Sequence, residues 1–157
     1  MNTSALKTFA QETRKKLVSS IKTRMNYILT EDTAELRGKQ NEINTLRKEI
    51  AAKGENNVVE EVTYTWFNRV MALRFMDANG YNVPMVITPA AGQIRPEILQ
   101  EAMGGNIDED LGISLDILRK DEEEIYHKLL IAICNQYNNS MPFLFESISD
   151  YTELLLP

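Results

Sequence analysis

The chain has 157 residues, of which 43% are hydrophobic and 25% charged, as in an ordinary globular protein. No apolar run is long enough to cross a membrane, and residues 1–29 hold no block of the signal-peptide type, so we expect neither membrane insertion nor export. The single Cys134 cannot form an internal disulfide, which favours a cytoplasmic location. The length predicts one domain over residues 1–157, and the patterns along the chain predict that it is an all-α helical bundle.

The first predicted helix follows Thr3 or Ser4, either of which can cap its start. Apolar side chains then recur at steps of three and four residues, as on one face of a helix. This stripe consists of Leu6, Phe9, Thr13, Leu17, Ile21, Met25 and Ile28.

Basic residues are concentrated in the same helix and lie largely off its stripe. Residues 1–50 hold ten of the 17 Lys and Arg residues against six acids, although the whole chain has a net charge of −6. Such a face is either an ordinary solvated surface or a surface for double-stranded DNA or a partner. Aromatic residues are not interleaved with these charges, which argues against stacking on single-stranded nucleic acid. The candidate phosphate contacts are Arg14, Lys15, Lys16, Lys22 and Arg24.

A second helix completes a predicted amino-terminal helical hairpin over residues 1–54. Asp32 and Glu35 make a capping box, and Gly54 ends the helix. Its apolar seam is thin and heptad-like, which indicates a hairpin with few buried atoms. The seam consists of Leu36, Ile43, Leu46 and Ile50.

The densest apolar stretch predicts a central buried helix over residues 57–80, around the only tryptophan, Trp66. Asn57 and Glu60 fit a capping box at its start, and the run from Asp77 to Gly80 ends it in a left-handed turn. Two adjacent stripes make the helix apolar on most sides. They are Val59, Val62, Trp66, Val70 and Leu73, and beside them Thr63, Phe67, Met71 and Phe75.

Two arginines, Arg69 and Arg74, lie on this apolar helix. A buried arginine is costly unless it is paired, so each is predicted to meet a carboxylate such as Glu60 or Asp77. An anion or an interdomain contact is the alternative role for these two side chains.

Residues 81–120 are predicted to be a connector, most irregular near residues 81–112, because its prolines and glycines interrupt any helix. Val83–Ile87 makes at best an edge strand. A short helix is predicted from Pro96 to Met103. The connector is either a plain surface loop or a surface that docks onto another domain or protein.

A second core helix is predicted over residues 121–138, with Asp121 and Glu124 as its capping box. Residues 139–157 read as the start of a continuation, because three leucines immediately precede the last residue, Pro157. A natural carboxyl terminus is more often polar, so we expect the chain to be the amino-terminal fragment of a much longer protein.

Known catalytic and ligand-binding motifs are absent from the sequence. It has no phosphate-binding glycine loop, no zinc-protease or Cys-x-x-Cys motif, and no nucleophile elbow. The acids near Asp108 do not match a calcium loop, because Leu111 stands where the invariant glycine should be. His127 is the only histidine, and we expect it at the surface or boundary. The residues therefore predict no catalytic, cofactor-binding or metal site in this segment.

Four stretches resemble a known family. They are MNTSALKTFAQETRKKL at the start, YTWFNRVMALRFMDANGY (Tyr64 to Tyr81), CNQYNNSMPFLFE (Cys134 to Glu146) and DYTELLLP (Asp150 to Pro157). Together they resemble the amino-terminal region of the PglX family, the adenine-specific DNA methyltransferases of the type 1 bacteriophage exclusion (BREX) system. The resemblance covers essentially the whole chain.

The resemblance implies a large enzyme that transfers a methyl group from S-adenosylmethionine to the exocyclic amine of adenine. The family's glycine-containing cofactor motif and its Asn-Pro-Pro-Tyr type motif do not occur here, so no catalytic residue carries over. We expect an inactive helical module that packs beside the catalytic core of its own chain and supports DNA engagement or assembly with other BREX proteins. The alternative is an independent protein-interaction scaffold with no DNA contact.

Overall fold

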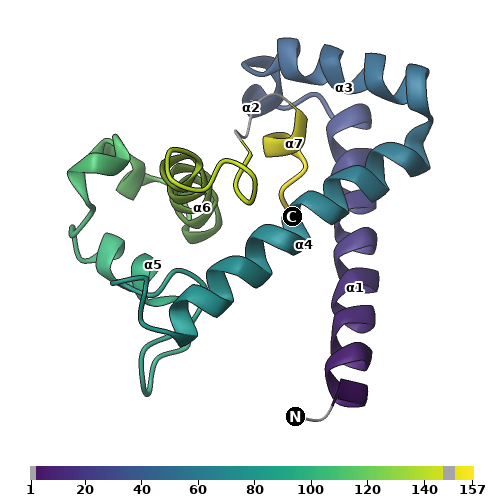
Figure 1. Cartoon of the computed structure of the whole chain (residues 1–157). Helices are drawn as coiled ribbons and strands as arrows, with labels where there is room; N and C mark the ends of the chain where they lie inside the picture. Colours follow the sequence, from purple (N-terminus) through teal and green to yellow (C-terminus); the bar gives the residue numbers. More distant parts are fainter. Residues whose placement is uncertain (1–2, 147–150) are drawn as a thin grey trace. The chain divides into compact units, whose positions relative to one another are not determined.

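A computed structural model describes residues 3–146 and 151–157 (Figure 1). Residues 147–150, where the chain was expected to continue beyond the last core helix, lie outside the described residues, as do the first two. The described residues are mostly helical and contain no strand, so the predicted all-α class is confirmed. In chain order the helices are α1 (Thr3–Thr30), α2 (Ala34–Arg37), α3 (Gln40–Lys53), α4 (Glu55–Ala78), α5 (Glu97–Met103), the 3-10 helices η1 (Glu109–Leu111) and η2 (Leu115–Arg119), α6 (Glu122–Asn138) and α7 (Tyr151–Leu154).

The chain folds into two compact units. Unit 1 comprises residues 1–67 and 149–157, and unit 2 comprises residues 68–148, so α4 contributes its first half to unit 1 and its second half to unit 2. The single domain predicted over residues 1–157 stays a prediction.

Unit 1 is built on apolar side chains from α1, α3, α4 and α7 that are removed from solvent. Trp66 is 1% exposed, and its indole N–H donates to the Thr152 carbonyl at 3.0 Å. α7 packs on α3, and the three leucines that follow Glu153 are all buried. The buried residues of α1 to α4 in this unit include Ile21, Met25, Ile28, Leu36, Ile43, Leu46, Val58, Val59 and Val62.

Only the second half of the α1 stripe is buried. Ile21, Met25 and Ile28 are at most 2% exposed, whereas Leu6 and Phe9 are 54% and 53% exposed. The helix therefore continues for several turns beyond the core that its stripe was expected to fill.

The second helix of the hairpin differs from its prediction in two details. It is broken into α2 and α3, because the chain leaves the helix at Gly38 and re-enters it at Gln40. Thr33, rather than Asp32, caps α2 by accepting from the Leu36 N–H at 3.3 Å. Asp32 instead pairs with Arg37 at 2.8 Å, since its carboxylate lies one residue too early to cap.

The central helix α4 confirms the predicted buried helix around Trp66, although Phe75 of its second stripe is 62% exposed. The helix begins two residues earlier than expected, so the predicted Asn57 capping box was wrong. Asn57 consequently lies inside the first turn, and its side-chain amide donates to the Lys53 carbonyl at 2.7 Å. At the other end, Gly80 has a φ of 70°, and the Tyr81 N–H bonds back to the Met76 carbonyl at 2.9 Å. This is the left-handed ending that the sequence predicted.

Unit 2 packs α5 and η1 against α6. Asp121 caps α6 by accepting from the Glu124 N–H at 2.9 Å, as predicted. The edge strand considered at Val83–Ile87 is not formed, and the described connector has one isolated bridge, between Pro89 and Pro96. The buried residues that hold these helices together are Ile98, Leu99, Ala102, Ile125, Leu129, Leu130, Ile131, Ile133 and Cys134.

Candidate functional site

The carboxylate of Asp77 organises the connector of unit 2. It is 5% exposed and accepts hydrogen bonds from three consecutive backbone amides, those of Val86 at 2.9 Å, Ile87 at 2.8 Å and Thr88 at 2.9 Å. The Thr88 hydroxyl and the Asn82 side-chain amide donate to the same carboxylate, at 2.9 Å and 2.6 Å. These amides are therefore not available to a strand, and this explains why the connector has none.

The ionised form of Asp77 is favoured by this arrangement. Burial by itself raises the pKa of the carboxyl group, but the hydrogen bonds from Asn82 and from the three amides outweigh burial, and the pKa lies below its ordinary value. Asp77 stands in the last turn of α4, where the helix dipole disfavours an anion. That misfit was the signal in the sequence that this acid has a special role.

Two tyrosines of α6 attach the connector to the helix. The Tyr126 hydroxyl donates to the Val86 carbonyl at 2.9 Å, and the Tyr137 hydroxyl donates to the Asn82 side-chain carbonyl. Burial raises the pKa of both phenols, which keeps them protonated as donors. Residues 82–88 of the connector are thus bonded to two helices, to α4 through Asp77 and to α6 through Tyr126 and Tyr137.

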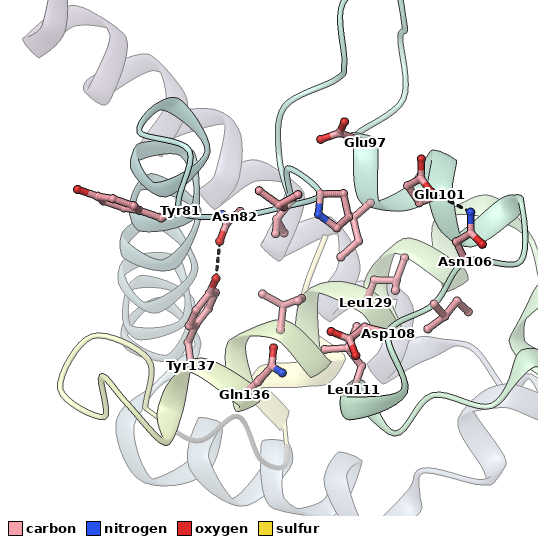
Figure 2. Close-up of a pocket in the computed structure, with 16 residues that line it drawn as sticks. Tyr81, Asn82, Glu97, Glu101, Asn106, Asp108, Leu111, Leu129, Gln136 and Tyr137 are labelled. Atoms are coloured by element: carbon pink, nitrogen blue, oxygen red, sulfur yellow. Dashed lines mark hydrogen bonds between the residues drawn. The ribbon is translucent and has the colours of Figure 1, made fainter.

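A cavity of about 640 Å³ lies between the connector, α5, the η1 segment and α6 (Figure 2). Its lining mixes apolar side chains with polar ones, among them the carboxylates of Glu97, Glu101 and Asp108. Figure 2 shows Glu97 and Glu101 on the α5 side, with Gln136 and Tyr137 on α6 across from them. The apolar lining comes from Val83, Pro84, Val86, Ile98, Ile107, Leu111, Leu129 and Ile133. These residues come from four separate segments, so no local pattern in the sequence pointed to the cavity.

The predicted phosphate contacts on α1 divide into two groups. Lys15, Lys16 and Lys22 are exposed. Arg14 pairs with Glu60, and Arg24 donates to the Leu154 carbonyl at 3.2 Å and lies over the Tyr27 ring. The three lysines are therefore presented to solvent, Arg14 lies in an exposed ion pair, and Arg24 is part-buried in unit 1. Contact with phosphate stays a prediction for all five.

Arg69 and Arg74 both lie in unit 2, on the second half of α4. The buried Arg69 donates to the Glu146 backbone carbonyl at 2.6 Å, and burial lowers its pKa. Arg74 donates to the Thr88 hydroxyl, which in turn donates to Asp77. Arg74 was expected to meet a carboxylate such as Asp77, and the two side chains are linked through the Thr88 hydroxyl. An anion-binding or interdomain role for the two arginines stays a prediction.

The buried Cys134 thiol of unit 2 is poorly suited to act as a nucleophile. Burial raises the pKa of the Cys134 thiol to about 12, so the nucleophilic thiolate is not populated near neutral pH.

Within residues 3–146 and 151–157, no three His, Cys, Asp or Glu side chains are grouped to hold a metal ion. In the same residues, no helix has both the length and the apolar content needed to span a bilayer.

Comparison with known proteins defines the class. The chain is 31% identical to the adenine-specific methyltransferase PglX of Lacticaseibacillus casei (strain Zhang), over 199 aligned positions that span 99% of this chain and 16% of that protein. It is 32% identical to the adenine-specific methyltransferase BrxX of Escherichia coli O9:H4 (strain HS), over 120 positions that span 71% of this chain and 10% of that protein. No family model and no solved structure matches.

The fold and these relatives therefore define a helical segment of the adenine-specific methyltransferase class. The chain belongs to the PglX and BrxX family of BREX methyltransferases, as the resemblance of its four stretches predicted. It spans only a tenth to a sixth of the length of these relatives.

Proposed function

We propose that this chain is a non-catalytic helical segment of a phage-defence adenine-specific DNA methyltransferase and that unit 2 supports assembly of the full enzyme with other BREX proteins. The two relatives support the enzyme class. Assembly rests on one observation above all. Unit 2 carries twelve acids against six Lys and Arg, a net charge of −6, while the charges of unit 1 balance at eleven of each sign. An acidic surface repels DNA phosphates, so protein partners fit unit 2 better than DNA does.

The non-catalytic role is supported by what the buried polar groups already do. Asp77 holds the connector, Arg69 holds the Glu146 carbonyl, and Cys134 is kept as a thiol by burial. The glycine-containing cofactor motif of the family does not occur in this chain. We assign cofactor binding and methyl transfer to other parts of the full-length enzyme.

Co-purification tests the assembly role. The chain carries an affinity tag and is co-expressed with the other proteins of its exclusion system, and the captured proteins are identified by mass spectrometry. We expect capture to fall several-fold when the exposed acids Glu109, Asp110 and Glu123 are changed to lysine. The matched control changes Lys15, Lys16 and Lys22 on α1 to glutamate and should leave capture unchanged. Equal capture by both variants, or no capture by the unaltered chain, contradicts the proposal.

DNA engagement is the second candidate function, and the exposure of Lys15, Lys16 and Lys22 on one helix favours it. If the three lysines contact phosphates without reading bases, log affinity should fall with log salt at a slope of about −0.9 per neutralised phosphate. Fluorescence anisotropy with a labelled DNA duplex, at salt concentrations from about 50 to about 200 mM, measures that slope. Reversal of the three charges should weaken binding equally for unrelated duplexes, and an affinity that ignores salt contradicts this role.

A further inference from the structure

The cavity of unit 2 is lined by apolar side chains together with three carboxylates and several neutral polar groups. Val86, Ile98 and Leu129 contribute buried apolar surface, while Glu97 and Glu101 project carboxylates from α5 (Figure 2). We propose that this cavity binds a lysine or arginine side chain presented by a peptide segment of a partner protein. The inference rests on the proposed assembly function and names the chemistry of the partner.

The dimensions of the cavity suit such an occupant. Its volume of about 640 Å³ falls within the range of roughly 300–1,000 Å³ that is typical of ligand pockets. Lysine and arginine side chains have an apolar stem and a charged head. The stem matches the apolar lining residues Val86, Leu129 and Ile133, and the head matches the carboxylates of the lining. The remaining volume admits the side chains that flank the basic residue in the peptide.

Each of the three carboxylates that line the cavity accepts one hydrogen bond within unit 2. Glu97 accepts from the Met85 N–H at 2.7 Å, and Glu101 accepts from the Asn106 side chain at 3.0 Å. Asp108 accepts from the Asp110 N–H at 3.0 Å as the cap of η1. A carboxylate has two oxygens with about four lone-pair sites, so each retains capacity to accept from an incoming cation. Bonds to a charged donor are stronger than those between neutral groups.

Charge complementarity selects a cation over other occupants. None of the described residues that line the cavity is Lys, Arg or His. The surrounding segment, residues 97–124, carries ten acids against Arg119 and Lys120. A phosphate or a carboxylate ligand would be repelled by the three carboxylates, and a purely apolar ligand would leave their remaining acceptor capacity unused. A basic amphipathic side chain satisfies both halves of the site.

The wall of the cavity is fixed before any ligand arrives. Asn82 and Val86 line it, and both are hydrogen-bonded to Asp77. Tyr126 and Tyr137 bond the same two residues from α6. A site that is already ordered loses little conformational entropy on binding, which favours affinity for a small probe.

Peptide probes test the site directly. The ¹⁵N-labelled chain is titrated with acetyl-Leu-Arg-Leu-amide, and with the same peptide carrying citrulline, a neutral isostere, in place of arginine. We expect saturable amide shifts at Val86, Ile98, Glu101 and Leu129 with the arginine probe. The citrulline probe should bind about tenfold more weakly or worse, because it lacks the charge-assisted hydrogen bonds.

A matched pair of variants locates the binding. Glu97→Gln combined with Glu101→Gln keeps an acceptor for Met85 and Asn106 but removes both charges, and should weaken the arginine probe about tenfold or more. Glu123→Gln removes a charge from an exposed α6 position outside the cavity and should change affinity less than twofold. The same spectra report whether each variant is folded.

Three results would overturn the assignment. The first is that the two probes bind equally well. The second is that the cavity variant and Glu123→Gln lose the same affinity for the arginine probe. The third is that the amide shifts are absent, or spread over the acidic surface without saturating. The proposed function fails separately. If the cavity variant still captures the exclusion proteins but no longer binds the probe, the cavity is not their docking site and assembly stands. If the probe binds and no exclusion protein is captured, assembly fails and the site stands.

Discussion

In unit 1, long helices bury apolar side chains against one another, and polar groups play a supporting part at the end of the chain. The indole of Trp66 and the guanidinium of Arg24 each bond a backbone carbonyl of the 151–157 segment. In unit 2, an irregular connector takes its shape from a single buried carboxylate, Asp77, which five donors surround. Both units bury apolar side chains, and the connector of unit 2 depends in addition on hydrogen bonds to an ionised carboxylate.

The magnitudes of those terms differ as well. Burial of a tryptophan removes about 150–250 Å² from water, which at ~25 cal/mol per Å² stabilises by roughly 4–6 kcal/mol as an upper estimate. Each hydrogen bond to Asp77 contributes about 1 kcal/mol net, but leaving a buried donor without its acceptor costs about 1–3 kcal/mol. Apolar burial in unit 1 does not depend on ionisation, whereas the bonds of unit 2 depend on a charged carboxylate. Unit 2 should thus be the more sensitive to pH.

Truncation of Trp66 gives the largest effect expected in unit 1. Trp66→Ala should lower the free energy of unfolding by about 3–5 kcal/mol, because it leaves a large cavity and removes the bond to Thr152. Urea unfolding followed by circular dichroism measures the change. Tyr64→Ala, two residues away and 70% exposed, is the control and should change the free energy by about 0.5 kcal/mol or less. A loss below about 1 kcal/mol at Trp66 would show that unit 1 does not depend on apolar burial.

Replacement of Asp77 is the corresponding change in unit 2. Asp77→Asn keeps the shape but turns one oxygen into an NH₂ group that faces backbone donors, so we expect a loss of about 2–4 kcal/mol. Hydrogen exchange of the Ile87 and Thr88 amides reports the loss locally. Asp116→Asn, at an exposed position of η2, is the control for the same chemical change. Retained protection of the two amides would show that the carboxylate does not hold the connector.

Acid titration separates the two units without any substitution. The folded pKa of Asp77 lies below its ordinary value, so its stabilisation is complete above the unfolded pKa of about 3.9 and is lost as the pH falls through the lower folded value. Between pH 7 and about pH 4 this contribution is constant. Below that, we expect the amide signals of Val86–Thr88 to move while the Trp66 indole signal does not. Asp77→Asn should abolish the local transition, and simultaneous movement of both sets of signals would contradict the contrast.

Local rules predicted the helices well because their causes lie close together in the sequence. The stripe around Trp66, the left-handed ending at Gly80 and the Asp121 cap of α6 each depend on residues within a turn or two. The capping box predicted at Asp32 and Glu35 was wrong, because α2 begins one residue later than expected and Thr33 caps it, while Asp32 pairs with Arg37.

The connector and the cavity could not be predicted in the same way. Prolines indicated an irregular segment, but its path is set by bonds from Asp77 to amides nine to eleven residues away. The cavity has lining residues from four segments, and the sequence predicted only that the helix over residues 121–138 would be buried. For α1 the sequence predicted too much burial. Its apolar pattern includes Leu6 and Phe9, but both side chains are exposed.

The smallest effect is expected at the ion pair between Arg14 and Glu60. Both side chains are about half exposed, at 54% and 49%, so water and salt screen the pair. A double-mutant cycle with Arg14→Ala and Glu60→Ala should give a coupling of about 0.2–1 kcal/mol that falls as salt is raised. A coupling well above this range would mean that unit 1 relies on a charged contact as unit 2 does, and the contrast between the units would weaken. A small coupling has a further use, because any loss of DNA affinity in Arg14→Ala could then be attributed to phosphate contact rather than to unfolding of α1.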